Sequence, residues 1–233
     1  IKKGESIIFS AGISEISPRR LKQTFEAEVA DRTPRDSFYH CLKNSAHQFH
    51  NKQEEDHYIL AGYPWFKCRA RDMFVSLPGL TLAVDEIGEF EDVMETARKA
   101  INNYIKGEPI GCKIYEMDDP DVLLWAVWAL QQYAKETSRE QCRAKYGSLL
   151  EEIIDFIRQR KHDNLFLHEN GLLYANGADR AITWMNSTVN GRPVIPRTGY
   201  IVEINALWYN ALRFIADLVR EGGNGLLADS LDA

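Results

Sequence analysis

The sequence predicts a mainly α-helical protein with one short β-hairpin near residues 163–175. Apolar residues recur at every third or fourth position in most segments between residues 17 and 220, as they do along one face of a helix. Short polar links separate these segments, and consecutive helices with short links pack as antiparallel neighbours. Strands and helices do not alternate, which argues against a parallel sheet. We therefore expect about seven helices, arranged in pairs.

The composition excludes several classes of protein. The 233 residues suffice for one large domain or two small ones. A net charge of -6 disfavours a general nucleic-acid surface, since phosphate binding needs clustered Lys and Arg. Charged residues or Pro interrupt every apolar run before it reaches membrane length, so we expect no transmembrane helix.

The cysteines and histidines give no sign of a metal centre. The 4 cysteines are widely spaced, which is typical of free thiols in a reducing compartment and favours a cytoplasmic protein. Cys41, His47 and His50 lie close in sequence, but no second ligand pair with zinc spacing follows. We therefore expect no metal site.

The N-terminal residues are predicted to form a short strand and then to lead into the main domain. Residues 3–11 place three apolar side chains between Gly4 and Gly12, as in a short strand. We expect residues 1–12 to be the end of a preceding segment or a linker, and residues 13–233 to form the domain.

Two helices should follow, one opened by Ser17 and one after Pro34, since Ser caps a helix and Pro suits its first turn. The polar stretch 51–56 is predicted to be a loop. A further helix begins near Arg71, and Pro78 should kink or divide it.

The clearest amphipathic helix covers residues 89–106, and Gly107 should end it as a C-cap glycine. Residues 121–137 are apolar on most sides and predict a buried helix, and residues 139–161 predict another. The link between residues 107 and 120 is expected to be a loop.

In the C-terminal third, the spacing of the apolar residues changes from the helical period to alternation. Leu and Tyr alternate with polar residues within 163–175 on both sides of a Glu-Asn-Gly turn, which predicts the hairpin. Residues 176–200 form a long predicted loop, and long loops in compact domains tend to be functional. Residues 203–220 predict a helix, and a further element begins at Leu226.

Residues 61–80 bring together aromatic and charged residues that could bind a ligand. The aromatic residues Tyr63, Trp65 and Phe66 precede the charged residues Arg69, Arg71 and Asp72. Aromatic rings stack on the apolar faces of sugars, and charged groups bind sugar hydroxyls. The same composition also suits a buried structural turn.

Four segments together resemble the C-terminal catalytic domain of glycogen debranching enzymes, the amylo-α-1,6-glucosidase family. They are AGYPWFKCRARDMFVSLPGL (61–80), DVLLWAVWALQQY (121–133), GLLYANGADRAITWMN (171–186) and PVIPRTGYIVEINALWYNAL (193–212). The resemblance covers roughly residues 58–220. It implies a barrel of six helical hairpins, the α/α toroid, of which residues 13–233 would be the N-terminal portion. It also implies hydrolysis, with inversion, of the α-1,6-linked glucose left at a trimmed branch point.

The resemblance also implies roles for particular residues. Asp72 corresponds to the family's general acid, and Asp121 to an acidic residue that faces the cleft before an apolar helix. The residues expected to bind substrate are Trp65, Phe66, Arg71, Asp121, Trp184, Asn186, Arg197 and Glu203. For Asp121 and Glu203, a carboxylate that only stabilises a helix start is the structural alternative.

The chain departs from the family pattern in two places. Arg69-Ala70 stand where the family usually has Trp-Gly, and Asn186 stands where it usually has Asp. The family's general base is a Glu near the end of the barrel, which we expect to lie beyond Ala233. Within the chain, Glu203 is the one candidate to replace this base, and sugar binding is its favoured role. We therefore expect the chain by itself to be inactive.

The expected partner is an α-glucan such as glycogen or a limit dextrin. Inverting hydrolysis needs two carboxyl groups about 6.5–9.5 Å apart, one of them protonated, and no metal or organic cofactor. Two alternatives remain open: a glucoamylase-like α-1,4-glucosidase, and a non-catalytic relative that only binds glycans. Arg69 and Asn186 are the residues that favour the second alternative.

Overall fold

The computed structural model describes residues 2–12, 16–62 and 65–232. The chain divides into two compact units, Ile1–Gln48 and Phe49–Ala233. About half of the residues are helical and the strands form small two-stranded sheets, so the mainly α class is confirmed. No helix in the described ranges is long and apolar enough to cross a membrane.

The first unit carries α1 (Leu21–Ala30) and α2 (Phe38–His47). The prediction that Ser17 caps the first helix is wrong, since α1 begins at Leu21 without a side-chain cap. In contrast, Ser37 caps α2 by accepting a hydrogen bond from the N–H of His40 at 3.1 Å.

The predicted strand at residues 3–11 is also wrong: the described residues of this segment form no strand. Ile7 and Phe9 are exposed instead. A strand is stable only when a neighbouring strand pairs with its N–H and C=O groups, and apolar composition alone supplies no such neighbour.

The second unit begins with a hairpin of β1 (His50–Gln53) and β2 (Asp56–Ile59), so the predicted loop at residues 51–56 is wrong. Most side chains of these strands are at least partly exposed, which fits their polar sequence. Tyr58 and Ile59 are the exceptions, since they are buried against α3 and α4. Glu54 makes the turn with a left-handed φ of 57°.

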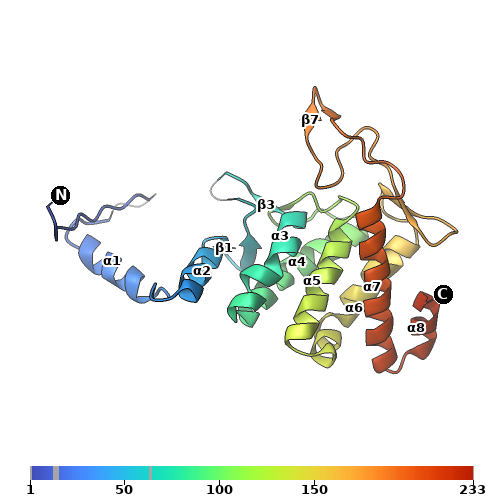
Figure 1. Ribbon diagram of the computed structural model, residues 1–233, viewed down its shortest axis with the longest axis horizontal. Coiled ribbons are helices and arrows are strands. Elements are labelled where there is room, and N and C mark those ends of the chain that lie inside the picture. Colours follow the sequence, from blue (N-terminus) through green and yellow to red (C-terminus); the bar gives the residue numbers. More distant parts are fainter. Residues whose placement is uncertain (1, 13–15, 63–64, 233) are drawn as a thin grey trace. The chain divides into compact units, whose positions relative to one another are not determined.

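Six helices of the second unit lie in two rows. They are α3 (Ala70–Leu80), α4 (Ile87–Lys106), α5 (Val122–Glu136), α6 (Arg139–Arg158), α7 (Val202–Glu221) and α8 (Gly225–Asp232). α3 packs on α5 and α5 on α7, while α4 packs on α6 and α8 on α7. In Figure 1, α3, α5 and α7 stand side by side, and their N-terminal ends lie together at the top of the view.

The helix predictions hold in most details. Gly107 ends α4 in the left-handed conformation, with a φ of 73°. Pro78, however, does not divide α3, which continues unbroken to Leu80. Pro78 stands in the last turn, where its missing N–H removes one hydrogen bond close to the end of the helix.

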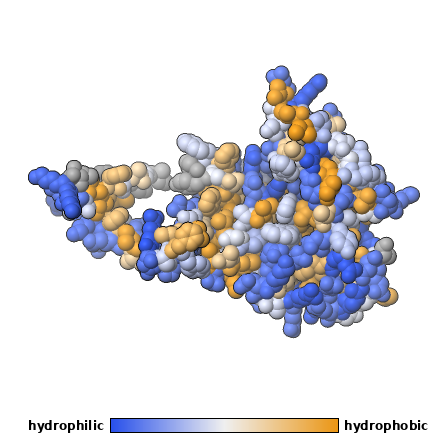
Figure 2. All heavy atoms as spheres, in the orientation of Figure 1, coloured by the Kyte–Doolittle hydropathy of each residue, from blue (hydrophilic) through white to orange (hydrophobic). Residues whose placement is uncertain are grey.

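Apolar side chains fill the space between the two rows. The Phe90 ring of α4 stacks on the Tyr133 ring of α5 at 5.1 Å, and Tyr133 meets Tyr146 of α6 edge-on at 5.5 Å. Val75 of α3 and Tyr209 of α7 are exposed. Figure 2 shows hydrophobic residues scattered among hydrophilic ones on the side of the second unit that faces the viewer.

The short strands lie in the connections. β5 (Leu165–Leu167) and β6 (Leu173–Ala175) form the predicted hairpin. β3 (Cys68–Arg69) pairs in parallel with β4 (Ile114–Tyr115), which joins the start of α3 to the 107–120 connection. β7 (Thr188–Val189) and β8 (Arg192–Pro193) form a small hairpin inside the predicted 176–200 loop.

Candidate active site

The sequence-predicted acid, Asp72, lies in the first turn of α3, at the end of the row where α5 and α7 also begin. A carboxylate in the first turn is favoured because the helix N-terminus carries partial positive charge. The side chain is exposed, and within the described residues no hydrogen bond or ion pair engages its carboxylate. It is therefore available to solvent and to a ligand.

Its neighbour Arg71 is instead locked inside the protein. Arg71 is 7% exposed and donates from Nε to Asp121 Oδ2 at 2.8 Å and from Nη2 to Asp121 Oδ1 at 2.8 Å. Such a two-pronged contact fixes both side chains. Trp125 Nε1 also donates to Asp121 Oδ2 at 3.2 Å. Both predicted substrate contacts, Arg71 and Asp121, are thus buried and occupied by each other.

The Arg71 guanidinium extends the network to two further segments. Its Nη2 donates to Asp119 Oδ2 at 2.7 Å and to the backbone carbonyl of Ile182 at 3.2 Å. Arg180 Nη2 donates to Asp119 Oδ1 at 2.7 Å, and Arg180 also pairs with Asp118. The network therefore ties the start of α3, the 107–120 connection and the 176–200 loop together.

Burial and charge oppose each other in this network. Burial on its own lowers the pKa of Arg71, but the hydrogen bonds and charges of Asp121 and Asp119 outweigh it and raise that pKa above its usual value. Burial raises the pKa of the Asp119 carboxyl, and the two arginines only partly offset this. The network is therefore held by charge-assisted bonds away from water.

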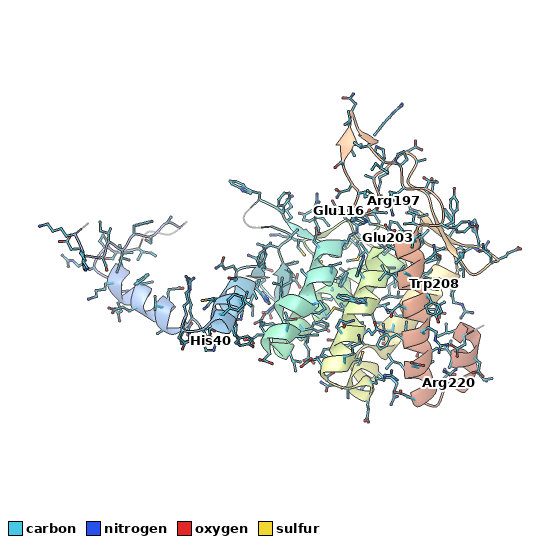
Figure 3. All side chains as sticks on the ribbon, in the orientation of Figure 1. His40, Glu116, Arg197, Glu203, Trp208 and Arg220 are labelled. Atoms are coloured by element: carbon cyan, nitrogen blue, oxygen red, sulfur yellow. The ribbon has the colours of Figure 1, made fainter. Side chains whose placement is uncertain are left out.

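Three other predicted residues meet at the start of α7. Glu203 accepts a hydrogen bond from Trp184 Nε1 at 3.3 Å through Oε1, and the same oxygen pairs with Arg197. Figure 3 shows Arg197 and Glu203 together at the N-terminal end of α7, on the same side of the unit as Glu116. The Trp184 ring is 61% exposed, while the Arg197 and Glu203 side chains are 19% and 36% exposed, so the cluster presents mainly the ring and part of the carboxylate to solvent.

The predicted Asn186 lines a cavity of about 470 Å³ between the 107–120 connection and the 176–200 loop. Arg69 borders the same cavity and pairs with Glu116 at 3.4 Å. Arg69 and Asn186, which both depart from the family pattern, therefore share one cavity. Its walls carry carboxylates, guanidinium groups and an amide, which are all groups that bind hydroxyls.

Trp65 and Phe66 are placed on the loop before β3, next to the β1–β2 hairpin, and they are 85% and 55% exposed. Arg69 lies over the Phe66 ring at 5.9 Å. The predicted contribution of Tyr63 falls outside the described residues. These rings border a different cavity from the one that Asn186 lines.

Sequence reasoning missed Asp119 and Arg180. Asp119 precedes Pro120 and resembles an ordinary helix-start residue, and Arg180 stands in a loop without periodicity. The one available signal was the run of acids at residues 116–121, which needs positive partners if it is buried. In the described ranges, no group of three or more His, Cys, Asp or Glu side chains is arranged to hold a metal ion.

A family model described as amylo-α-1,6-glucosidase matches residues 43–224, which is most of the chain. The matched range includes Asp72, the Arg71–Asp121 pair and the cluster around Glu203. Searches of curated proteins and of solved structures found no match. The chain therefore belongs to the amylo-α-1,6-glucosidase family.

Proposed function

We propose that this protein hydrolyses α-1,6-glucosidic branch linkages in glycogen or related α-glucans by an inverting mechanism, with Asp72 as the general acid. The observation that supports this best is the exposed Asp72 carboxylate, at the end of the helical row where the Trp184, Arg197 and Glu203 cluster also lies. The family match supplies the substrate class.

The neighbouring residues divide into two roles in this proposal. Trp184 stacks on a glucose ring, because that ring is exposed. Glu203, whose side chain is 36% exposed, binds hydroxyls of the same sugar with Arg197 beside it. Arg71 and Asp121 position the start of α3 rather than touch sugar, because their polar atoms are buried and bonded to each other.

The second carboxylate of the reaction is not Glu203 in our proposal. α5 stands between α3 and α7. Glu203 Oε1 accepts from Trp184 and pairs with Arg197 rather than facing α3. We therefore assign sugar binding to Glu203 and propose no general base among the described residues.

The packing of the helices supports part of an α/α toroid. In such a barrel, parallel inner helices form one ring and their partners return along the outside. α3, α5 and α7 would be inner helices, because their N-terminal ends lie together, and α4 and α6 would be outer ones. The shared end of the inner helices would then form the floor of the active site.

The direct test is glucose release by the full-length gene product from a branched limit dextrin, compared with release from maltose. We expect glucose from the dextrin and much slower release from maltose. A preference for maltose would favour a glucoamylase-like α-1,4-glucosidase and contradict the proposal. Binding of the dextrin without any glucose release would favour a non-catalytic relative. The 233-residue chain alone should release no glucose.

A further inference from the structure

The first unit leaves an apolar stripe of α1 open to solvent. Leu21, Phe25 and Val29 recur at every fourth position, so they lie along one side of the helix. No residue of α1 is buried, and Phe25 and Val29 are 50% and 52% exposed. A helix of 10 residues is only marginally stable by itself, because most helical stability comes from the packing of an apolar face. We therefore expect a partner to cover this stripe.

The charged residues of α1 are arranged against the needs of an isolated helix. Acidic side chains stabilise the first turn of a helix and basic ones the last turn, because of the helix dipole. α1 has no acidic residue in its first turn, no basic residue in its last turn and no side-chain cap at its N-terminus. These charges therefore do little for the stability of α1 itself.

The charges of α1 and its flanks instead separate by sign along the helix. Three bases lie at the N-terminal end and three acids follow towards the C-terminal end: Arg19, Arg20, Lys22, Glu26, Glu28 and Asp31. Within residues 19–32, only Arg32 departs from this order, and it lies beyond the helix and pairs with Glu28 at 4.0 Å. A helix with this polarity is complementary to a second copy of itself in antiparallel orientation.

An antiparallel pair centred near Thr24 satisfies both the stripe and the charges. Positions at equal distances before and after the centre then lie opposite each other, and two-fold symmetry repeats each contact. Lys22 lies opposite Glu26, on the same side of the stripe. Phe25 of each helix lies level with the space between Phe25 and Leu21 of the other, so the apolar side chains interdigitate.

The polar residues of α1 argue against a membrane surface as the partner. Amphipathic helices that bind anionic lipids carry mainly Lys and Arg on their polar face. In contrast, α1 has one Lys and two Glu. A second copy of α1 supplies both an apolar stripe and the opposite order of charges.

We propose that α1 is a self-association surface, on which α1 of a second copy of this chain packs in antiparallel orientation. Two helices of 10 residues bury less than the roughly 1,000 Å² of a stable interface. The dimer is therefore weak and forms as the protein concentration rises. This inference rests on α1 and is independent of the proposed function.

The test is sedimentation of the 233-residue chain over protein concentrations from about 5 μM to about 0.5 mM. The wild type should shift from monomer to dimer. Phe25→Glu should weaken the dimer about a hundredfold or more, since it replaces the two central rings by carboxylates. Phe9→Glu is the matched control, because Phe9 is an 86% exposed ring of the same unit outside α1, and it should associate as the wild type does. Circular dichroism checks that the variants fold.

A charge exchange tests the antiparallel orientation. Lys22→Glu should weaken the dimer about tenfold, because it places like charges opposite each other at Glu26 in two symmetric contacts. Adding Glu26→Lys to this variant restores opposite charges and should recover most of the affinity. In a parallel pair each residue faces its own copy, so Lys22→Glu would exchange one like-charge contact for another and leave association unchanged.

Four outcomes would overturn the inference. They are a wild type that stays monomeric over the whole concentration range, Phe25→Glu that associates as the wild type does, and Lys22→Glu without effect on the dimer. The fourth is a monomeric wild type that cosediments with vesicles of phosphatidylcholine and phosphatidylserine and loses this binding in Phe25→Glu, which would show a membrane surface as the partner. A dimer that Phe25→Glu dissociates, Phe9→Glu preserves and the charge exchange restores supports the inference.

Discussion

Replacing Arg71 by Met should strongly destabilise the second unit. The substitution keeps most of the side-chain volume but removes the guanidinium that faces Asp119 and Asp121, whose side chains are 6% and 3% exposed. Removing one partner of a buried ion pair leaves an uncompensated charge and costs about 3–5 kcal/mol. For a domain of this size, that lowers the unfolding midpoint temperature by about 6–20 °C.

The assay is equilibrium unfolding in urea at pH 7, followed by circular dichroism. Arg139→Met is the matched control, because Arg139 pairs with Glu221 and its side chain is 50% exposed. An exposed pair contributes less than about 1 kcal/mol, so this variant should unfold nearly as the wild type does.

A second variant isolates the cause. Adding Asp121→Asn to Arg71→Met removes one of the stranded charges while Trp125 keeps an acceptor. The double variant should therefore be more stable than Arg71→Met alone. If Arg71→Met costs no more than the Arg139 control, or if the two changes simply add, the buried network does not hold the site as we describe.

Three further predictions concern the loop, a close contact and pH. Arg180→Met should speed hydrogen exchange in the 176–200 loop, since Arg180 ties it to Asp118 and Asp119; unchanged exchange would show that other contacts anchor it. Gly177→Ala should lower the free energy of unfolding by about 1–3 kcal/mol, because its Cβ would lie 2.5 Å from the Arg197 carbonyl oxygen. Gly79→Ala, with open space around it, is the control and should not destabilise. Burial lowers the pKa of His162 to about 4, so the unfolded chain binds this proton more readily. Stability should therefore fall by up to about 3 kcal/mol as the pH drops from about 6.5 to 4, and His162→Gln should flatten that fall in urea titrations; an equal slope in both proteins would contradict this.

Helices whose apolar residues recur with a clear helical period could be predicted from the sequence. Residues 89–106 and 121–137 became α4 and α5 within a few positions, because burying one apolar face decides such segments. The sequence also anticipated the hairpin around residues 169–171. The polar β1–β2 hairpin was missed, since strands whose side chains are mostly exposed lack the apolar alternation that marks a strand.

The site was harder to anticipate. The resemblance named Trp184, Arg197 and Glu203, which do meet, but it could not show that Arg71 and Asp121 are buried on each other. That contact joins residues 50 positions apart, and no local pattern encodes it. The placement of Asn186 and Arg69 in one cavity likewise depends on tertiary packing.

The most direct test of the central claim compares two substrates in wild-type full-length protein and in Asp72→Asn. A general acid protonates the departing sugar oxygen, and its loss should slow glucose release from branched limit dextrin by about 10²–10⁴-fold. The leaving group of α-glucosyl fluoride is fluoride, which needs no proton, so Asp72→Asn should hydrolyse this substrate at a rate close to that of the wild type. Equal losses on both substrates, or full activity on the dextrin, would contradict the assignment of Asp72 as the acid.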